Sequence, residues 1–354
     1  MKYINKESWL WKIFYNAFRF IISLGFIIGF QTLFGVENTL LGVAISVGFT
    51  MLPLCHLDLK PWTMFWIIVF LYGGGPLIAQ LSIVNPWLAF VCDFLFLALI
   101  ILIANEPIEY QTNITFLLCF VFSQSTVVSW EQFPMRAISG IAGGLFVGAC
   151  VVFNWHRKGY GGEIGIRQQV LRCQVNRSYL LRMSFGVSLA MLIGSLFHIS
   201  KPLWISIVVM SLTQLEFSET LTRIKHRFIG TLVGIVIFFV FFQYLIPQQY
   251  AGLFVMFLGY MGFFLPEYKF KQIINAISAL NASLVILDTM TAIENRLICL
   301  IAGIGIVLLI YFVTKFIRHL HSKISDTMKQ WADDFFEQLE TKKYDIHMNR
   351  VLKG

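Results

Sequence analysis

The stretch SETLTRIKHRFIGTLVG, residues 218–234, joins a strongly basic segment to an apolar one. Within five positions it holds four basic side chains: Arg223, Lys225, His226 and Arg227. The residues that follow are almost entirely apolar. Because Lys and Arg gather at the cytoplasmic ends of transmembrane helices, this boundary predicts a helix that enters a membrane from the cytoplasm.

The composition of the whole chain agrees with a membrane location. Of the 354 residues, 57% are hydrophobic and 13% are charged, and the mean hydropathy is +0.73. Soluble domains carry about 25% charged residues. Apolar runs recur along the chain, and they predict an all-α polytopic membrane protein with about 12 transmembrane helices of about 20 residues. The net charge of +8 lies in the connections, so it reports topology and does not indicate a nucleic-acid partner.

The apolar runs give the boundaries of the expected spans. They are residues 12–34, 38–56, 62–83, 85–104, 112–129, 134–155, 178–198, 202–217, 226–246, 249–267, 272–290 and 296–317. Residues 156–177 are expected to form a basic cytoplasmic linker, and residues 318–354 a cytoplasmic amphipathic tail. The excess of Lys and Arg in alternate connections predicts that both termini are cytoplasmic.

Two pairs of segments indicate an internal repeat. RAISGIAGGLFVG, from Arg136, is similar to RLICLIAGIGIVL, from Arg296, and RFIISLGFIIGFQTLFG, from Arg19, is similar to RMSFGVSLAMLIGSLFH, from Arg182. Residues 1–155 and 178–317 would then be two parallel six-helix repeats, related by an axis along the membrane normal. The pathway of such a fused pseudo-dimer is expected between its halves.

Glycines predict where helices approach one another closely. Gly140, Gly144 and Gly148 recur at every fourth residue, the spacing that brings small residues onto one helix face. The stretch YGGGP, residues 72–76, predicts an interruption of the third span.

The stretch KPLWISIVVMSLTQLEFSETLTRIKHRFIGTLVG, residues 201–234, resembles the fusaric acid resistance and aromatic acid exporter family. The positions that carry the resemblance are Trp204, Thr220, Arg223, Arg227, Gly230, Thr231 and Gly234. Larger members of that family have sizeable cytoplasmic domains after each membrane block, so this chain looks like a compact, membrane-only member.

The resemblance implies a function and a set of partners. It implies an efflux transporter of the bacterial inner membrane that exports small organic anions, with aromatic acids as the favoured class. Trp204, Arg223 and Arg227 would then contact the substrate. The partners would be the organic anion, the lipid bilayer, a periplasmic membrane-fusion (adaptor) protein and further copies of the chain.

Asp93 lies near the middle of the fourth predicted span, where a carboxylate is costly unless it is neutral, paired or hydrated. Reversible protonation during transport would explain its presence. A buried carboxyl group that is hydrogen-bonded to a neighbouring helix would explain it equally well.

Other polar residues within the spans are candidates for substrate binding. Arg19 and Arg182 occupy equivalent places in the two repeats, and a guanidinium can bind a carboxylate through two parallel hydrogen bonds. They can also reach the membrane surface as interface anchors. Asn275 and Asn281 share a face of the eleventh span, where they would line a cavity or bind a neighbouring helix.

Proton-coupled efflux of organic anions is therefore the favoured function. A passive anion channel and a non-transporting membrane scaffold of an envelope assembly are the alternatives. No phosphate-binding loop, metal-ligand spacing or nucleophile–base pair is visible in the sequence, so neither an enzyme nor a cofactor is expected.

Overall fold

The computed structural model describes residues 9–265, 267–284 and 287–351, without the side chains of residues 243, 248, 321 and 324–351. The chain divides into two compact units, Met1–Val307 and Leu308–Gly354. The described part of the second unit continues the last helix. The α-helices are α1 (Trp9–Phe34), α2 (Thr39–Met51), α3 (Pro61–Gln80), α4 (Pro86–Ala104), α5 (Asn113–Ser125), α6 (Phe133–Lys158), α7 (Ile166–Cys173), α8 (Arg177–Leu196), α9 (Leu203–Leu212), α10 (Phe217–Val240), α11 (Ala251–Met261), α12 (Tyr268–Ser283) and α13 (Thr289–Val351).

The expected all-helical membrane class is confirmed, and each predicted span contains a helix. Seven segments of the described residues are long and apolar enough to cross a membrane. They are Trp9–Phe34, Val36–Leu54, Pro61–Ile83, Pro86–Ala104, Phe133–Lys158, Ile166–Leu196 and Thr289–Leu320. The chain is therefore a multi-pass membrane protein, while the count of 12 spans stays a prediction.

Helix α9 shows why the larger count is not confirmed. The apolar run 202–217 is long, but α9 has only 10 residues and reaches about 15 Å at 1.5 Å per residue. The hydrocarbon core of a bilayer is about 30 Å thick. Helices α5 and α11 are also shorter than a full span.

Local sequence sets several helix boundaries. The side chain of Asn85 accepts a hydrogen bond from the backbone N–H of Trp87 at 2.8 Å, and Pro86 follows it, so α4 begins with both favoured N-terminal features. Gly159 ends α6 with a φ of 67°, a conformation that glycine adopts without a steric penalty. The glycines of the YGGGP stretch do not interrupt α3, which is continuous from Pro61 to Gln80. The predicted break is therefore wrong.

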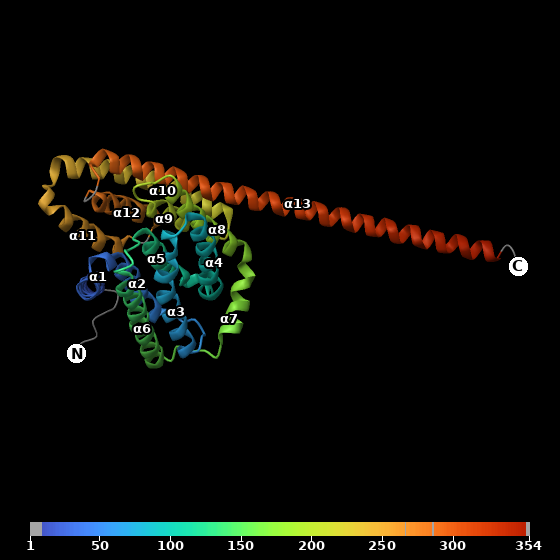
Figure 1. Ribbon diagram of the computed structural model, residues 1–354, viewed down its shortest axis with the longest axis horizontal. Coiled ribbons are helices and arrows are strands. Elements are labelled where there is room, and N and C mark those ends of the chain that lie inside the picture. The colour runs from blue at the N-terminus through green and yellow to red at the C-terminus, as the bar shows by residue number, and fades with distance from the viewer. Residues whose placement is uncertain (1–8, 266, 285–286, 352–354) are drawn as a thin grey trace. The chain divides into compact units, whose positions relative to one another are not determined.

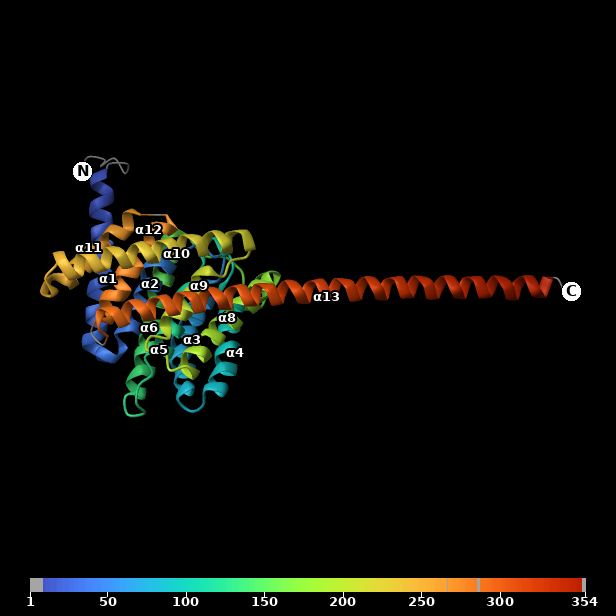
Figure 2. The same ribbon diagram turned by 90° about the horizontal axis from the view of Figure 1, so that it is seen from above.

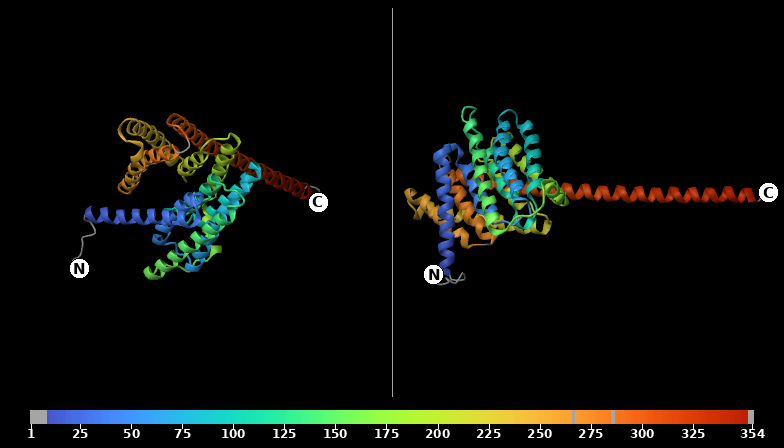
Figure 3. Two further views of the ribbon diagram at one scale, coloured as in Figure 1. Left: turned by 60° about the vertical axis from the view of Figure 1, so that its left-hand side comes forward. Right: turned by 90° about the horizontal axis from the view of Figure 1, so that it is seen from below.

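Helices of the first unit form two groups. Helix α3 packs against α6 and α5, and α10 packs against α12; α10, α11 and α12 lie together, apart from α3 and α6 (Figures 1 and 3). Figure 2 shows α10 running across the direction of α3 and α4. In the first proposed repeat α1 packs against α2, and in the second the helices at the equivalent places, α8 and α9, also pack against each other. The parallel repeat and its domain boundaries stay predictions.

The α3–α6 contact depends on glycine, as the sequence predicted. A Cβ atom at Gly140 would lie 2.8 Å from the carbonyl oxygen of Tyr72, and one at Gly144 would lie 3.0 Å from the Cα atom of Val69. Both distances are shorter than normal contacts, and both partners are backbone atoms. The two helices can approach this closely only because these positions lack a side chain.

We expect Gly140→Ala to destabilise the protein by about 1–3 kcal/mol, the usual cost of overpacking. Gly25→Ala in α1 is the matched control, because no atom lies within 4 Å of its added Cβ. Thermal unfolding in detergent would compare the two variants. Equal unfolding midpoints would contradict this account of the α3–α6 contact.

Candidate functional site

Four arginines from three helices gather around the short helix α9. Arg182 comes from α8, Arg223 and Arg227 come from α10, and Arg296 comes from α13. Each contacts α9 or the non-helical residues directly after it. This set of four residues is called the α9 arginine cluster below.

Two members of the cluster bind the backbone where α9 ends. Nη2 of Arg182 donates to the carbonyl oxygens of Gln214 and Leu215 at 3.1 and 2.9 Å, and Nη1 of Arg223 donates to that of Ser211 at 3.4 Å. The last carbonyl groups of a helix lack partners within the helix, and its C-terminal end favours cations. These two arginines therefore stabilise the end of α9.

The other two members contact side chains of α9 itself. Nη1 of Arg227 donates to the hydroxyl group of Ser211. The Cζ atom of Arg296 lies 4.9 Å from the centroid of the Trp204 ring, within the range of a cation–π interaction. Only 2% of Arg227 and 4% of Arg296 is exposed, and Arg227 is near enough for its charge to repel that of Arg296.

Arg136, which the proposed repeat pairs with Arg296, has protein partners for all three of its nitrogen atoms. Nε donates to the side-chain oxygen of Asn38 at 2.8 Å, and Nη2 donates to the carbonyl oxygen of Glu37 at 2.5 Å. Nη1 donates to the carbonyl oxygens of Ser123 and Thr126. Arg136 therefore stabilises the end of the short helix α5 and ties it to the segment before α2.

A cavity of about 410 Å³ lies beside α1 and contains Arg19. Its lining combines two guanidinium groups with aromatic rings, and no acidic residue is among the described residues that form it: Tyr15, Phe18, Arg19, Ile22, Phe49, Thr50, Pro53, Leu54, Cys150, Phe153, Asn154 and Arg157. The Cζ atom of Arg19 lies 5.7 Å from the ring centroid of Tyr15 and 5.5 Å from that of Phe263. This space is called the Arg19 cavity below.

A second cavity, of about 320 Å³, lies between the two proposed repeats. Gln124 and Ser125 line it from α5, and Ser195 and Ser206 line it from the second half. Asp93 lies directly behind Gln124: its Oδ2 accepts a hydrogen bond from Nε2 of Gln124 at 3.2 Å, and 1% of the residue is exposed. The other oxygen of Asp93, Oδ1, has no partner among the described residues.

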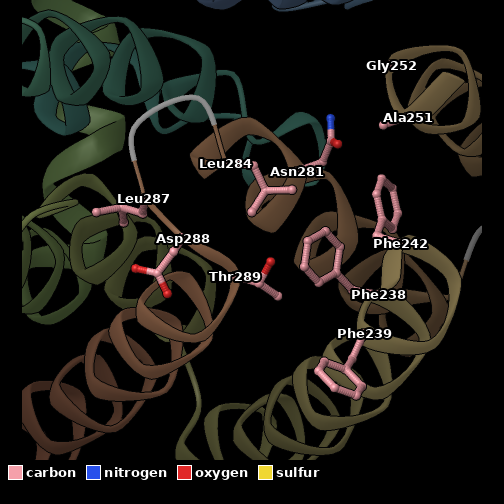
Figure 4. Close-up of a pocket in the computed structure, with 10 residues that line it drawn as sticks. All are labelled: Phe238, Phe239, Phe242, Ala251, Gly252, Asn281, Leu284, Leu287, Asp288 and Thr289. Carbon is pink, nitrogen blue, oxygen red and sulfur yellow. The ribbon is translucent and has the colours of Figure 1, made fainter. Parts of the chain in front are cut away.

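The largest of these three cavities, about 560 Å³, is aromatic. In Figure 4 the rings of Phe238 and Phe239 from α10, and of Phe242 from the short π-helix that follows it, line one wall, while Asn281 and Thr289 belong to the opposite wall. Asp288 also lines it and accepts a hydrogen bond from the N–H of Thr291 at 3.1 Å. Hydrogen bonds from Thr291 lower the pKa of Asp288, so this carboxylate is charged at neutral pH.

Comparison with known proteins agrees with the resemblance noted in the sequence. Residues 189–310 match the family described as fusaric acid resistance protein-like. Members of this family are transporters rather than enzymes, so the match indicates a membrane transport or resistance protein.

A short region of the chain is also similar to a bacterial protein. Over 70 residues the chain is 37% identical to the uncharacterized protein YhfK of Escherichia coli (strain K12). The similar region covers 20% of this chain and 10% of that protein. No solved structure matches the chain.

The fusaric acid resistance-like segment contains Trp204, Arg223, Arg227, Asn275 and Asn281, but these residues do not form one site. Trp204 and the two arginines lie together at α9. Asn281 lines the aromatic cavity, whereas Asn275 is exposed and does not line it. Their roles in substrate binding stay predictions.

The predicted residues outside the segment also lie apart from one another. Arg182 joins the α9 arginine cluster, Arg19 has its own cavity, and Asp93 lies behind the cavity between the halves. The sequence analysis missed Arg157 and Gln124. Arg157 belongs to the basic last turn of α6 and so resembled a topology signal, whereas Gln124, a polar residue within an apolar run, gave a signal that was overlooked.

We expect Arg136→Lys to lower the stability of the protein by about 2 kcal/mol, because an ammonium group cannot reproduce the three directions in which the guanidinium donates. Arg167→Lys on the exposed face of α7 is the control. Thermal unfolding of the purified variants measures the effect. A midpoint unchanged by Arg136→Lys would show that the end of α5 does not depend on this fork.

Proposed function

We propose that the protein is a transporter of the bacterial inner membrane that exports small organic anions, with aromatic acids as the favoured class, in exchange for protons. The observation that carries the proposal is the lining of the Arg19 cavity. It combines Arg19 and Arg157 with the rings of Tyr15, Phe18 and Phe153 and contains no carboxylate among its described residues.

This lining suits an aromatic acid in three respects. A guanidinium binds a carboxylate through charge-assisted hydrogen bonds, and the neighbouring rings offer apolar area and aromatic packing. The volume of about 410 Å³ lies within the range of about 300–1,000 Å³ that is typical of small-molecule sites. A carboxylate in the lining would repel such a cargo.

Proton coupling is assigned to Asp93. Its Oδ2 accepts from Gln124, which lines the cavity between the halves, so Oδ1 is the oxygen available to a proton. A buried carboxylate without a cation is costly, and protonation removes that charge. Gln124 would connect the protonation state of Asp93 to the contents of the cavity.

The contacts between connections support the proposed topology in the first half. Three segments predicted to be cytoplasmic meet: Lys60 N–H donates to the carbonyl oxygen of Ile164, and Asn176 Nδ2 donates to Glu106 Oε1 at 2.7 Å. Connections predicted on the opposite side also meet, where Arg136 binds Glu37 and Thr126. We propose on this basis that both termini are cytoplasmic.

The first test concerns the arginine. We expect Arg19→Gln to raise the concentration of an aromatic carboxylate at half-maximal transport by about tenfold to a hundredfold, because one charge-assisted hydrogen bond is lost. Arg19→Lys should have a smaller effect, because it keeps the charge and loses the planar fork. Proteoliposome efflux of benzoate measures both.

Lys12→Gln is the matched control, since it removes an exposed cation from the same helix. If Lys12→Gln and Arg19→Gln affect efflux equally, Arg19 acts only as an anchor at the membrane interface. The main support for an anionic cargo would then be lost.

The second test concerns the proton. We expect Asp93→Asn to abolish uphill efflux driven by a pH gradient and to leave downhill exchange of cargo measurable. An amide keeps the size of the side chain and can accept from Gln124, but it does not titrate. Asp58→Asn makes the same chemical change in an exposed loop and should keep uphill efflux. Unimpaired uphill efflux in Asp93→Asn would favour a passive anion channel or a different coupling group.

A further inference from the structure

We propose that Arg227 and Arg296 hold a small inorganic anion of halide type as a resident counter-ion between α9, α10 and α13. This site is separate from the Arg19 cavity and does not require that the protein transport an organic acid. It rests on the burial of the two arginines, on the absence of a carboxylate partner for them, and on their unpartnered N–H groups.

The two guanidinium groups form a buried pair of like charges. Their exposed fractions are 2% and 4%, and the positive charge of Arg227 acts on Arg296. Each buried ion costs several kcal/mol in lost hydration, and repulsion adds to that cost. A charge in such a place is normally paired.

The described residues supply no negative charge to this pair. Their ion pairs are His56–Asp58, Arg172–Asp58 and Lys269–Glu267, none of which includes Arg227 or Arg296. What the structure provides instead is the face of the Trp204 ring and the hydroxyl group of Ser211. Neither of these carries a full negative charge.

Both arginines also have donors without an acceptor. Among the described residues, Nε of Arg227 and Nη1 of Arg296 have no hydrogen-bond partner, and the same holds for Nδ2 of the adjacent Asn295, of which 8% is exposed. A buried donor without a partner costs about 1–3 kcal/mol, and more when the group is charged. One small anion between the two guanidinium groups would accept from both and would cancel their repulsion.

Arg136 provides an internal comparison. It is equally buried and occupies the equivalent place in the first half, but all three of its nitrogen atoms donate to protein oxygens. Glu37 also lies near enough to attract its charge. The first half therefore satisfies its arginine with protein groups, whereas the second half leaves two cations that need an external partner.

The size of the occupant follows from its surroundings. Both guanidinium groups are almost fully buried and each already contacts a protein group, Ser211 or the Trp204 ring, which favours a halide-sized ion over a bulkier aromatic acid. Its nearest groups are N–H donors and an aromatic ring, so a monovalent, weakly hydrated anion such as chloride suits the site.

The experiment measures stabilisation by chloride. Wild-type protein in nanodiscs of phosphatidylcholine is unfolded thermally in sodium gluconate while chloride replaces gluconate at constant ionic strength. Because a ligand that binds only the folded state stabilises it by mass action, the midpoint should rise saturably, by about 5 °C at a hundredfold excess over Kd. Arg296→Gln should abolish the rise.

Arg167→Gln is the control, because it removes an exposed cation from α7; it should keep the chloride response. If Arg296→Gln fails to fold, X-ray diffraction from wild-type crystals grown in bromide replaces it. An anomalous peak beside Arg227 and Arg296 supports the site, and its absence overturns it.

Several outcomes would overturn the proposal. They are a wild-type midpoint that does not respond to chloride, and a response of equal size in Arg296→Gln. A rise in the midpoint with benzoate but not with chloride would show that the arginine pair binds the organic cargo instead of a halide. A rise in the midpoint that occurs only in phosphatidylglycerol nanodiscs would show that a lipid phosphate occupies the site. Benzoate efflux by protein that lacks any chloride response would overturn this site and leave the proposed function intact.

Discussion

The backbone carbonyl groups at the ends of α5 and α9 are the constraint on which the rest of the membrane unit depends. Both helices are shorter than a full span, and the last carbonyl groups of a helix have no partners within the helix. Arginine side chains solve this problem at both places. Arg136 binds the end of α5, and Arg182 and Arg223 bind the end of α9.

These arginine contacts also join the helices to one another. Because Arg136 lies on α6 and also binds Glu37 and Asn38, it joins α5 and α6 to the segment before α2. Around α9 the arginines come from α8, α10 and α13, so this one short helix contacts three others. Helix α9 also contributes Ser206 to the cavity between the proposed halves.

A consequence is an interior that carries more positive than negative charge. Arg182, Arg227 and Arg296 are all buried, while Asp93 is the buried carboxylate among the described residues and lies with Gln124 instead of with an arginine. An excess of buried cations attracts anions to the interior. Guanidinium groups therefore have two uses in this protein. They bind backbone carbonyl oxygens at the helix ends, and in the proposed function they bind the carboxylate of the organic anion.

Sequence reasoning found the helices and failed where their ends depend on tertiary contacts. The polar residues Thr213, Gln214 and Glu216 directly follow the end of α9, but the expected span 202–217 included them. The arginines that bind this ending lie on other helices. The YGGGP stretch contains strong helix breakers, yet α3 continues through it. Its glycines pack against neighbouring helices: Gly73 faces Ile141 of α6, and Gly74 faces Phe96 of α4. Arg227 and Arg296 lie far apart in the chain, and nothing in the sequence indicates that both contact α9. By contrast, the glycine spacing of α6 and the family motif were local signals and could be read directly.

The central claim is that the Arg19 cavity binds organic anions through their charge. Equilibrium binding of radiolabelled benzoate and of benzamide, its neutral isostere, to the purified protein in nanodiscs tests it most directly. The account predicts saturable binding of benzoate and at least tenfold weaker binding of benzamide, since one charge-assisted hydrogen bond is worth about 1.5–3 kcal/mol. Equal binding of the two compounds, or saturable binding of neither, would contradict it.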